Sequence, residues 1–241
     1  MVLQKLLEPL ALTEVEKVAL SRRSVRLYRK KQIPREMVKR VLEAGRYAPS
    51  AGNGQPWKFV VLRDAEIING LTQTVVRMCR FISSALDYTR PGKAWLKPLS
   101  KLFIRRMPRE LHPIPFRAMS LIAEGKLGLW HGAPTVILIF KDVRGISNPD
   151  LDCGIAGQNM VLVAHGLSLG TCWVGFAQLA FRFPLRKWKK LLGIEWPYEF
   201  ASSIGIGWPL GNPDGMVERA ARPVEWYENG TKTIILRKED G

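Results

Sequence analysis

Residues 135–141 read Thr-Val-Ile-Leu-Ile-Phe-Lys, an almost unbroken apolar run that is rich in β-branched side chains. Because successive side chains of a strand point to opposite faces, such a run predicts a strand that is buried on both faces. We therefore expect residues 135–141 to form a central strand, with the other elements arranged around it.

Shorter β-rich runs occur on both sides of this strand in the sequence. Their composition and the turn residues that bound them predict further strands at residues 58–63, 171–175, 201–207 and 231–237. The last of these strands could pair at the edge of the sheet or with another subunit.

Helical periodicity and helix end signals predict four helices, over residues 13–21, from Pro34 until Pro49 stops the pattern, over residues 149–165 and over residues 184–192. We expect Gly166 to end the third helix in a left-handed conformation and Gly193 to close the fourth. Helices and strands follow no strict βαβ rhythm, so the pattern favours an α+β fold in which helices flank a mixed sheet.

The composition is that of a folded domain. The chain has 241 residues, of which 46% are hydrophobic and 24% charged, and this length fits a single domain over residues 1–241. Lys and Arg outnumber Asp and Glu by 37 to 21, which gives a net charge of +16. Such an excess indicates an anionic partner: a phosphate-bearing cofactor, nucleic acid or an anionic membrane surface.

The cysteine content indicates a reducing compartment. Cys79, Cys153 and Cys172 form no Cys-x-x-Cys pair, and the histidines lack ligand spacing, so neither a disulfide framework nor a metal site is expected. The first residues do not resemble a signal peptide, and we expect a cytoplasmic protein.

One uncharged stretch could span a membrane by its length. Residues 154–181 contain no Lys, Arg, Asp or Glu. Their glycines and polar residues favour a buried helix, a glycine turn and a buried strand over a transmembrane helix.

The first candidate binding motif is Arg22-Arg23-Ser24-Val25-Arg26, at the end of the first predicted helix. Guanidinium groups bind phosphate in a bidentate manner, and a serine hydroxyl adds a hydrogen bond, so this motif could hold one phosphate monoester. The alternative is a solvated basic loop that continues through residues 29–31.

The second candidate motif is the loop before the strand at residues 58–63, Pro49-Ser-Ala-Gly-Asn-Gly-Gln-Pro-Trp57. Small residues allow close backbone approach, and the amides of Asn53 and Gln55 both donate and accept hydrogen bonds. Such amides can match the mixed edge of a planar heterocycle. An ordinary polar loop is the alternative.

Taken together and in this order, these motifs resemble the N-terminal half of nitroreductase-family flavoproteins. Downstream stretches are also similar to that family: residues 152–159 at the start of an apolar helix, the following residues 166–175, and residues 204–211 with 219–223. The resemblance covers residues 21–64 and 131–226. It implies a nitroreductase-like α+β fold with a mainly antiparallel central sheet, and a homodimer whose subunits share the sites.

The resemblance also implies an FMN site in the dimer interface. Arg22, Arg23, Ser24 and Arg26 would contact the phosphate, the ribityl chain and the pyrimidine end, and the loop of the other subunit would approach from the opposite side through Ser50, Ala51, Gly52, Asn53 and Gln55. The ring would be lined by Trp173, Val174 and Gly175, and the phosphate clamp would be completed by Arg219 or Arg222. Many relatives place the basic residue where this chain has Ala221, so either arginine could substitute.

By the same resemblance the chain would be a flavin oxidoreductase. FMN would accept hydride from NADH or NADPH and pass it to a small acceptor such as a nitroaromatic, quinone or enone, with ping-pong kinetics. The catalytic residues stay unknown because the chemistry is borne by the flavin. Arg26 is the candidate for supplying positive charge near the pyrimidine.

A basic insertion departs most from the family pattern. Residues 70–131 hold 11 Lys or Arg and three Asp or Glu, a net charge of +8. This insertion, at about residues 70–130, could pack on the partner subunit, form a lid over the active site, or contact an anionic membrane peripherally through residues 93–109.

The competing function is a basic protein that binds nucleic acid or a membrane surface without turnover. It does not explain the amides of Asn53 and Gln55, so nucleic acid is not favoured as a partner.

Overall fold

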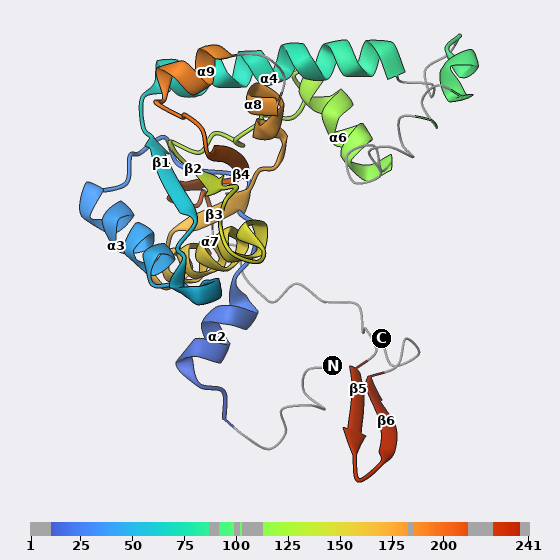
Figure 1. The fold of residues 1–241 in the computed structure, drawn as a ribbon. Coiled ribbons are helices and arrows are strands. Elements are labelled where there is room, and N and C mark those ends of the chain that lie inside the picture. The colour runs from blue at the N-terminus through green and yellow to red at the C-terminus, as the bar shows by residue number, and fades with distance from the viewer. Residues whose placement is uncertain are drawn as a thin grey trace. The chain divides into compact units, whose positions relative to one another are not determined.

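The protein is described by a computed structural model that covers residues 11–86, 92–98, 102, 113–182, 186–211 and 224–236. The chain forms two compact units (Figure 1). The larger unit comprises residues 24–212, and the smaller one combines residues 1–23 with residues 213–241. The expectation that residues 1–241 form a single domain stays a prediction.

A four-stranded sheet forms the centre of the larger unit. The strands lie in the order β1 (Trp57–Leu62), β2 (Thr135–Asp142), β4 (Tyr198–Gly207) and β3 (Gly170–Trp173), and every neighbouring pair is antiparallel. A parallel bridge between Ser24 and Thr171 adds the start of the unit to the β3 edge. The sheet is therefore mixed but mainly antiparallel, as predicted.

Helices cover both faces of this sheet (Figure 1). On one face lie α3 (Arg35–Arg46) and α7 (Pro149–Gly166), and on the other lie α4 (Ala65–Leu86), α6 (Pro113–Ala123), α8 (Leu179–Arg182) and α9 (Arg186–Leu191). The β2 side chains divide between the two cores. Ile137 and Ile139 pack with α3 and α7, whereas Val136, Leu138 and Phe140 pack with the other helices, and all five are fully buried. The prediction of a central strand is confirmed.

Helix α7 follows its predicted limits, but its ending differs from the prediction. Gly166 is still helical, and the left-handed residue is Ser168, with φ of 59°. The amide of Ser168 donates to the carbonyl of His165, and the amide of Leu169 to that of Ala164. Because these bonds close the last turn two residues later, the expectation that Gly166 is left-handed was wrong.

The uncharged stretch from residue 154 to 181 is divided among α7, β3, the short 3₁₀ helix η3 (Phe176–Gln178) and α8. None of the helices in the described ranges is both long and apolar enough to cross a membrane. Gly193 has φ of 60° and follows α9, as predicted.

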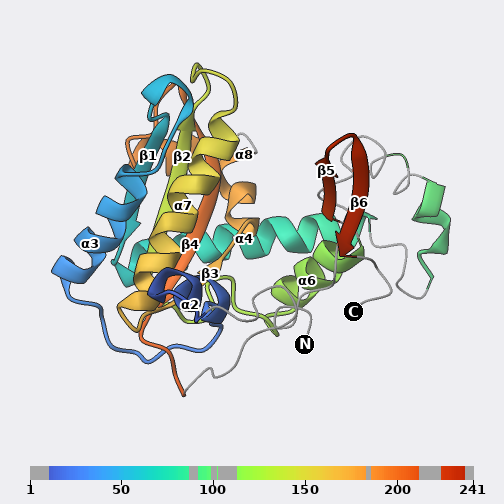
Figure 2. The same ribbon diagram turned by 90° about the horizontal axis from the view of Figure 1, so that it is seen from below.

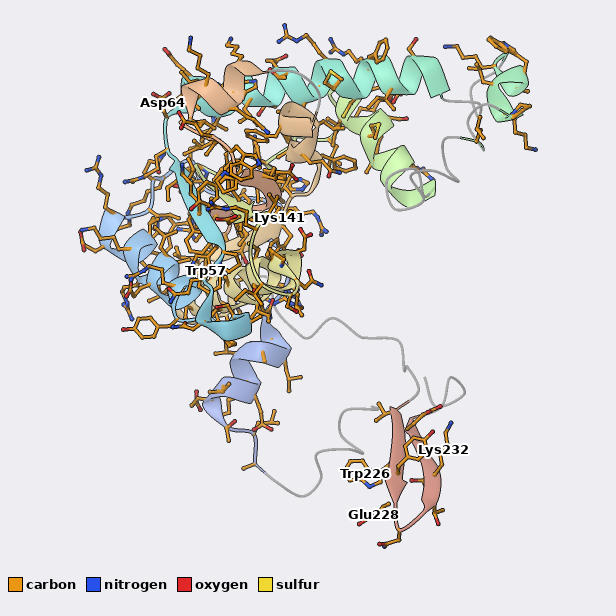
Figure 3. The ribbon with its side chains drawn as sticks, in the orientation of Figure 1. Trp57, Asp64, Lys141, Trp226, Glu228 and Lys232 are labelled. Carbon is orange, nitrogen blue, oxygen red and sulfur yellow. The ribbon has the colours of Figure 1, made fainter. Side chains whose placement is uncertain are left out.

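The smaller unit contains α2 (Glu14–Ser21) and a hairpin of β5 (Val224–Glu228) and β6 (Thr231–Leu236). The predicted capping box is present, since Thr13 Oγ1 accepts from the Glu16 amide and Glu16 accepts from the Thr13 amide. The strand expected at residues 231–237 pairs with β5, which was missed. The turn signal was Asn229-Gly230, whose two residues adopt left-handed conformations in the hairpin (Figure 3).

Candidate functional site

The arginine motif runs into the larger unit as an extended segment beside β3. The amide of Val25 donates to the carbonyl of Thr171 at 2.8 Å, and a Cβ atom on Gly170 would lie 2.8 Å from the Val25 side chain. Val25 is therefore buried, while Ser24 and Arg26 on either side of it are exposed. The segment offers a hydroxyl and a guanidinium to solvent from a backbone fixed by the sheet.

Arg22 and Arg23 end the smaller unit and directly precede Ser24 in the chain. Their Nε atoms are buried and have no hydrogen bond partner among the residues that the structure describes. A buried donor without a partner costs free energy unless an ion or ligand satisfies it. These donors fit a phosphate group, which can accept from both.

Tyr28 anchors the segment. Its hydroxyl donates to the carbonyl of Val25 at 2.7 Å and lies 3.3 Å from that of Gly205. Burial raises the pKa of Tyr28, so this side chain stays neutral and acts as a hydrogen bond donor. The anchoring role of Tyr28 was not predicted. The signal in the sequence that could have indicated it is an aromatic residue two positions after Arg26.

His131 lies within the electrostatic reach of Arg26. It adopts a left-handed conformation with φ of 53° in the turn before β2. Burial and the Arg26 cation lower the pKa of His131, so the neutral imidazole is favoured at neutral pH. The spacing of the histidines in the sequence bears only on metal binding, whereas the proximity of His131 to Arg26 depends on the fold.

The amide loop is held by its own hydrogen bonds. The Gln55 amide donates to Ser50 Oγ at 3.0 Å, and Gln55 Nε2 donates to Asn53 Oδ1 at 3.1 Å. Ala51–Asn53 form the 3₁₀ helix η1, and the residues Gly52, Asn53 and Gln55 are left-handed with φ of 57°, 55° and 46°. Left-handed residues other than glycine are uncommon and concentrate at functional sites.

Two side-chain polar atoms of this loop are exposed and available for hydrogen bonds. Within the described ranges, neither Asn53 Nδ2 nor Gln55 Oε1 has a hydrogen bond partner, and both side chains are exposed. The loop thus presents one free donor and one free acceptor side by side, which matches the edge of a heterocycle that has both functions.

The arginine segment and the amide loop lie at opposite ends of the sheet (Figure 2). Ser24 bridges Thr171, which pairs through Ile206 of β4 with Thr135 at the start of β2. The loop precedes Trp57, which pairs with Lys141 near the end of β2, and the Asp142 amide donates to the Pro56 carbonyl. Six residue steps along β2, from Thr135 to Lys141, separate these two levels, which is about 20 Å at the usual rise per residue. The two groups of one chain therefore do not face each other.

The predicted ring-lining residues differ in what they can offer. The side chain of Val174 is buried in the core, its amide bonds the Ser203 carbonyl, and its own carbonyl accepts from the Ser203 hydroxyl. Trp173 is half-buried and its ring packs directly over Gly157 of α7. Gly175 is exposed, with no atom within 4 Å of the position of a Cβ. Gly175 is thus the position of the three where a ligand can approach the backbone. Arg219 and Arg222 lie outside the described residues.

Cysteine and metal chemistry find no centre among the described residues. Cys153 is buried at the start of α7, and burial together with Asp150 and Asp152 raises its pKa to about 12, so it is not a nucleophile at neutral pH. In the part of the chain that the structure describes, no group of His, Cys, Asp and Glu could hold a metal ion.

The sequence matches the model of the nitroreductase family over residues 19–208. Two archaeal relatives carry the name "Putative NADH dehydrogenase/NAD(P)H nitroreductase". The one from Methanothermobacter thermautotrophicus is 27% identical over 80% of this chain and 76% of its own length. The one from Archaeoglobus fulgidus is 25% identical over 83% of this chain and 88% of its own length.

Solved structures show the same fold. A nitroreductase with bound FMN from Desulfitobacterium hafniense has a TM-score of 0.63 and 22% identity, and the match covers 86% of this chain and 96% of that one. A nitroreductase with bound FMN from Bacteroides fragilis has a TM-score of 0.60 and 22% identity, and the match covers 93% of this chain and 100% of that one. The predicted nitroreductase-like fold is confirmed.

Proposed function

The chain belongs to the nitroreductase family, a family of NAD(P)H-dependent flavin oxidoreductases, and we propose that it passes hydride through FMN to a small organic acceptor. Nitroaromatic, quinone and enone compounds are the acceptor classes. Bound FMN would supply the hydride chemistry, and because donor and acceptor would use the same place in turn, we expect ping-pong kinetics.

The observation that carries this proposal is the pair of unpartnered Nε donors of Arg22 and Arg23 directly before Ser24. A basic protein that binds a polyanion at its surface gains little from buried donors, whereas one phosphate monoester accepts several such bonds. Ser24 and Arg26, which follow them in the sequence, are exposed, and we assign these four residues to the phosphate, the ribityl chain and the pyrimidine end.

Arg26 is proposed to supply positive charge beside the ring. It is exposed, and no described acidic side chain forms an ion pair with it. An unneutralised guanidinium stabilises negative charge that develops nearby during reduction. We also propose that Arg219 or Arg222 completes the phosphate clamp.

The amide loop of a second subunit is proposed to complete each site. The ends of one sheet are too far apart for residues 24–26 and 50–55 of one chain to enclose the same ligand, whereas a second copy can bring its loop to the arginine segment. The hairpin also favours association, because the aromatic side chains of Trp226 (Figure 3) and Tyr227 are exposed on it. We therefore propose a homodimer with two shared sites.

The three cysteines are free and buried, which agrees with a reducing compartment. A cytoplasmic location stays a prediction.

An anaerobic absorbance titration tests this function. The purified protein is examined for flavin bands before and after addition of FMN, and NADH and NADPH are then added in turn. We expect bound flavin that is bleached by one donor or both and is reoxidised by a quinone or a nitroaromatic compound. A colourless protein that takes up no FMN would contradict the proposal and favour the basic binding protein.

A further inference from the structure

The C-terminal half of α4 presents an exposed stripe that the proposed flavin site does not use. Its exposed positions recur at helical spacing and are Gln73, Arg77, Arg80, Phe81 and Ser84. The opposite side of the helix is fully buried through Leu71, Val75 and Cys79. Phe81 is 68% exposed, so an aromatic ring lies in solvent one turn after Arg77 and next to Arg80 in the chain.

A short segment lies at the end of this stripe. Lys93 Nζ donates to the Ser84 carbonyl at 2.6 Å and so ties residues 92–98 to the last turns of α4. In the 3₁₀ helix η2 (Ala94–Leu96), Leu96 is buried, whereas Trp95 is 74% exposed. The segment therefore adds Trp95 and Lys97 to the end of the stripe. We use the name α4 patch for Arg77, Arg80, Phe81, Lys93, Trp95 and Lys97.

Within the described residues, no acidic side chain neutralises the positive charge of the α4 patch; Asp87, the residue after α4, lies outside them. Residues 67–86 and 92–98 contain no Asp or Glu. No described acidic side chain pairs with a cation of the patch, and Glu124, next to the Ala123 carbonyl that Arg80 binds, is paired with Lys126.

Helix α9 adds further cations beside the first half of α4. Trp188 Nε1 donates to Thr74 Oγ1 at 3.0 Å, which fixes the two helices together. Residues 186–194 contain four Lys or Arg and no Asp or Glu. Nitrogen atoms gather along the outer side of these helices in Figure 3, and in Figure 2 the end of α4 extends beyond the sheet with α6.

We propose that the α4 patch docks peripherally on an anionic phospholipid bilayer. Trp and Phe side chains are favoured at the boundary between headgroups and acyl chains, and Lys and Arg beside them bind anionic headgroups. The earlier prediction of membrane contact concerned residues 93–109, of which the structure describes 93–98 and 102. In the described residues, the proposed membrane-binding surface lies mainly on α4 and on residues 93–97.

Two other partners fit the patch less well. A nucleic-acid duplex matches the cations but leaves Phe81 and Trp95 without an apolar environment. A second copy of this chain would bring an identical positive patch, and like charges oppose such contact.

Flotation of the full chain with vesicles tests the proposal. We compare vesicles of phosphatidylcholine alone with vesicles that also contain phosphatidylglycerol, at low and high salt. We expect binding only to the anionic vesicles, weakened by salt. Trp95→Ser is expected to lower the affinity about tenfold through lost apolar contact. The double variant Arg77→Gln with Lys97→Gln is expected to lower it about 30-fold, at the usual contribution of a cation near an anionic surface.

Matched controls separate docking from attraction by net charge. Trp196 is also a solvent-exposed tryptophan, at 76%, but lies outside the patch, so Trp196→Ser should leave vesicle affinity unchanged. Lys30→Gln with Lys31→Gln removes the same charge elsewhere and should lower the affinity clearly less than the patch pair. Equal losses in the two charge pairs, or no loss with Trp95→Ser, would overturn the proposal.

Two further measurements address the other partners. Tighter binding to a DNA duplex than to anionic vesicles, weakened selectively by the patch variants, would replace the bilayer by nucleic acid. A monomer–dimer equilibrium shifted by Trp95→Ser would assign the patch to self-association, and this also overturns the proposal. Thermal unfolding of each variant shows that a loss of binding does not reflect a loss of fold. None of these outcomes depends on whether the protein holds flavin.

Discussion

The arginine segment and the amide loop are both polar, exposed stretches next to a strand, but they are held in different ways. Residues 24–29 are fixed from outside, by hydrogen bonds to β3, to Trp208 and to Pro209. The loop at residues 50–55 is held by hydrogen bonds among its own residues and contains three left-handed residues. The first presents charge and the second presents paired amide groups. This difference supports the proposal that the two stretches are half-sites for different ends of one ligand.

Helix α7 holds these half-sites apart. It begins near the amide loop, where Gly145 approaches both Pro56 and Pro149, and it leads to Gly170, which packs on Val25 of the arginine segment. Each half-site is therefore rigidly placed at one end of the larger unit. A second subunit is what the proposed function needs in order to bring opposite ends together.

The largest effect is expected from the charged half-site. Arg23→Gln combined with Arg26→Gln removes two guanidinium groups, and charge-assisted hydrogen bonds of this kind contribute about 1.5–3 kcal/mol each. We expect FMN affinity to fall about 100-fold or more, measured by fluorescence titration. Lys30→Gln with Lys31→Gln removes the same charge next to the segment and should change the affinity less than threefold, by about 0.6 kcal/mol at most. Similar losses in both pairs would show that only net charge matters.

A mixed dimer tests whether the half-sites belong to different subunits. One subunit carries Arg26→Gln and the other carries Asn53→Ala with Gln55→Ala, so one of the two shared sites contains no substitution. We expect the mixed dimer to hold about half of the wild-type flavin, while each variant alone holds little.

The control for this experiment is a mixed dimer of Arg23→Gln and Arg26→Gln subunits. Both of its sites are altered in the arginine half, so no wild-type site is restored. If the first mixed dimer does not regain flavin above this control, the two half-sites act within one subunit.

A moderate effect is expected from the helix that separates the half-sites. A Cβ atom on Gly157 would collide with the ring of Trp173 and come within 3.1 Å of Ile139. We expect Gly157→Ala to lower the free energy of unfolding by about 1–3 kcal/mol in urea denaturation. Gly154→Ala, in the same helix with no atom within 4 Å, should raise it by up to about 1 kcal/mol. If the Gly157→Ala variant were as stable as the Gly154→Ala variant, the Trp173 ring would have moved aside, and this would contradict the prediction.

The smallest effect concerns the reactivity of two thiols, Cys153 at the start of α7 and Cys172 in β3. Burial and neighbouring aspartates raise the pKa of Cys153 to about 12, whereas at Cys172 burial raises the pKa and Arg26 opposes the shift. We expect both thiols to react slowly with a thiol reagent at pH 8, and Cys172 to react before Cys153 as the pH rises. Arg26→Gln should slow Cys172 and leave Cys153 unchanged, as mass spectrometry of the modified peptides would show.

The buried thiols of Cys79 and Cys153 make the stability of the fold depend on pH in a defined direction. Their pKa values in the folded protein lie above the ordinary thiol value, so at high pH the unfolded chain releases protons first. The stabilisation is complete below about pH 9 and is lost as the pH rises toward the folded values, about 11 for Cys79 and about 12 for Cys153. Stability that increases between pH 9 and 11 would contradict these shifts.

Local signals in the sequence predicted most elements of the fold because those signals act over a few residues. The apolar run at residues 135–141 specified a strand buried on both faces, and Thr13 with Glu16 specified the start of α2. The left-handed residue after α7 was misplaced because two hydrogen bonds of the final turn, not the glycine alone, choose the position. β5 was missed although Asn229-Gly230 marked its turn.

The sequence by itself determined which residues are suited to phosphate and to a heterocycle, since guanidinium and amide groups have these properties in any context. Only the tertiary structure decided where they lie. Strand register places residues 24–26 and 50–55 at opposite ends of the sheet, and it brings Arg26 near Cys172, Tyr28 and His131. Register depends on pairing between residues far apart in the chain, and no local pattern specifies that pairing.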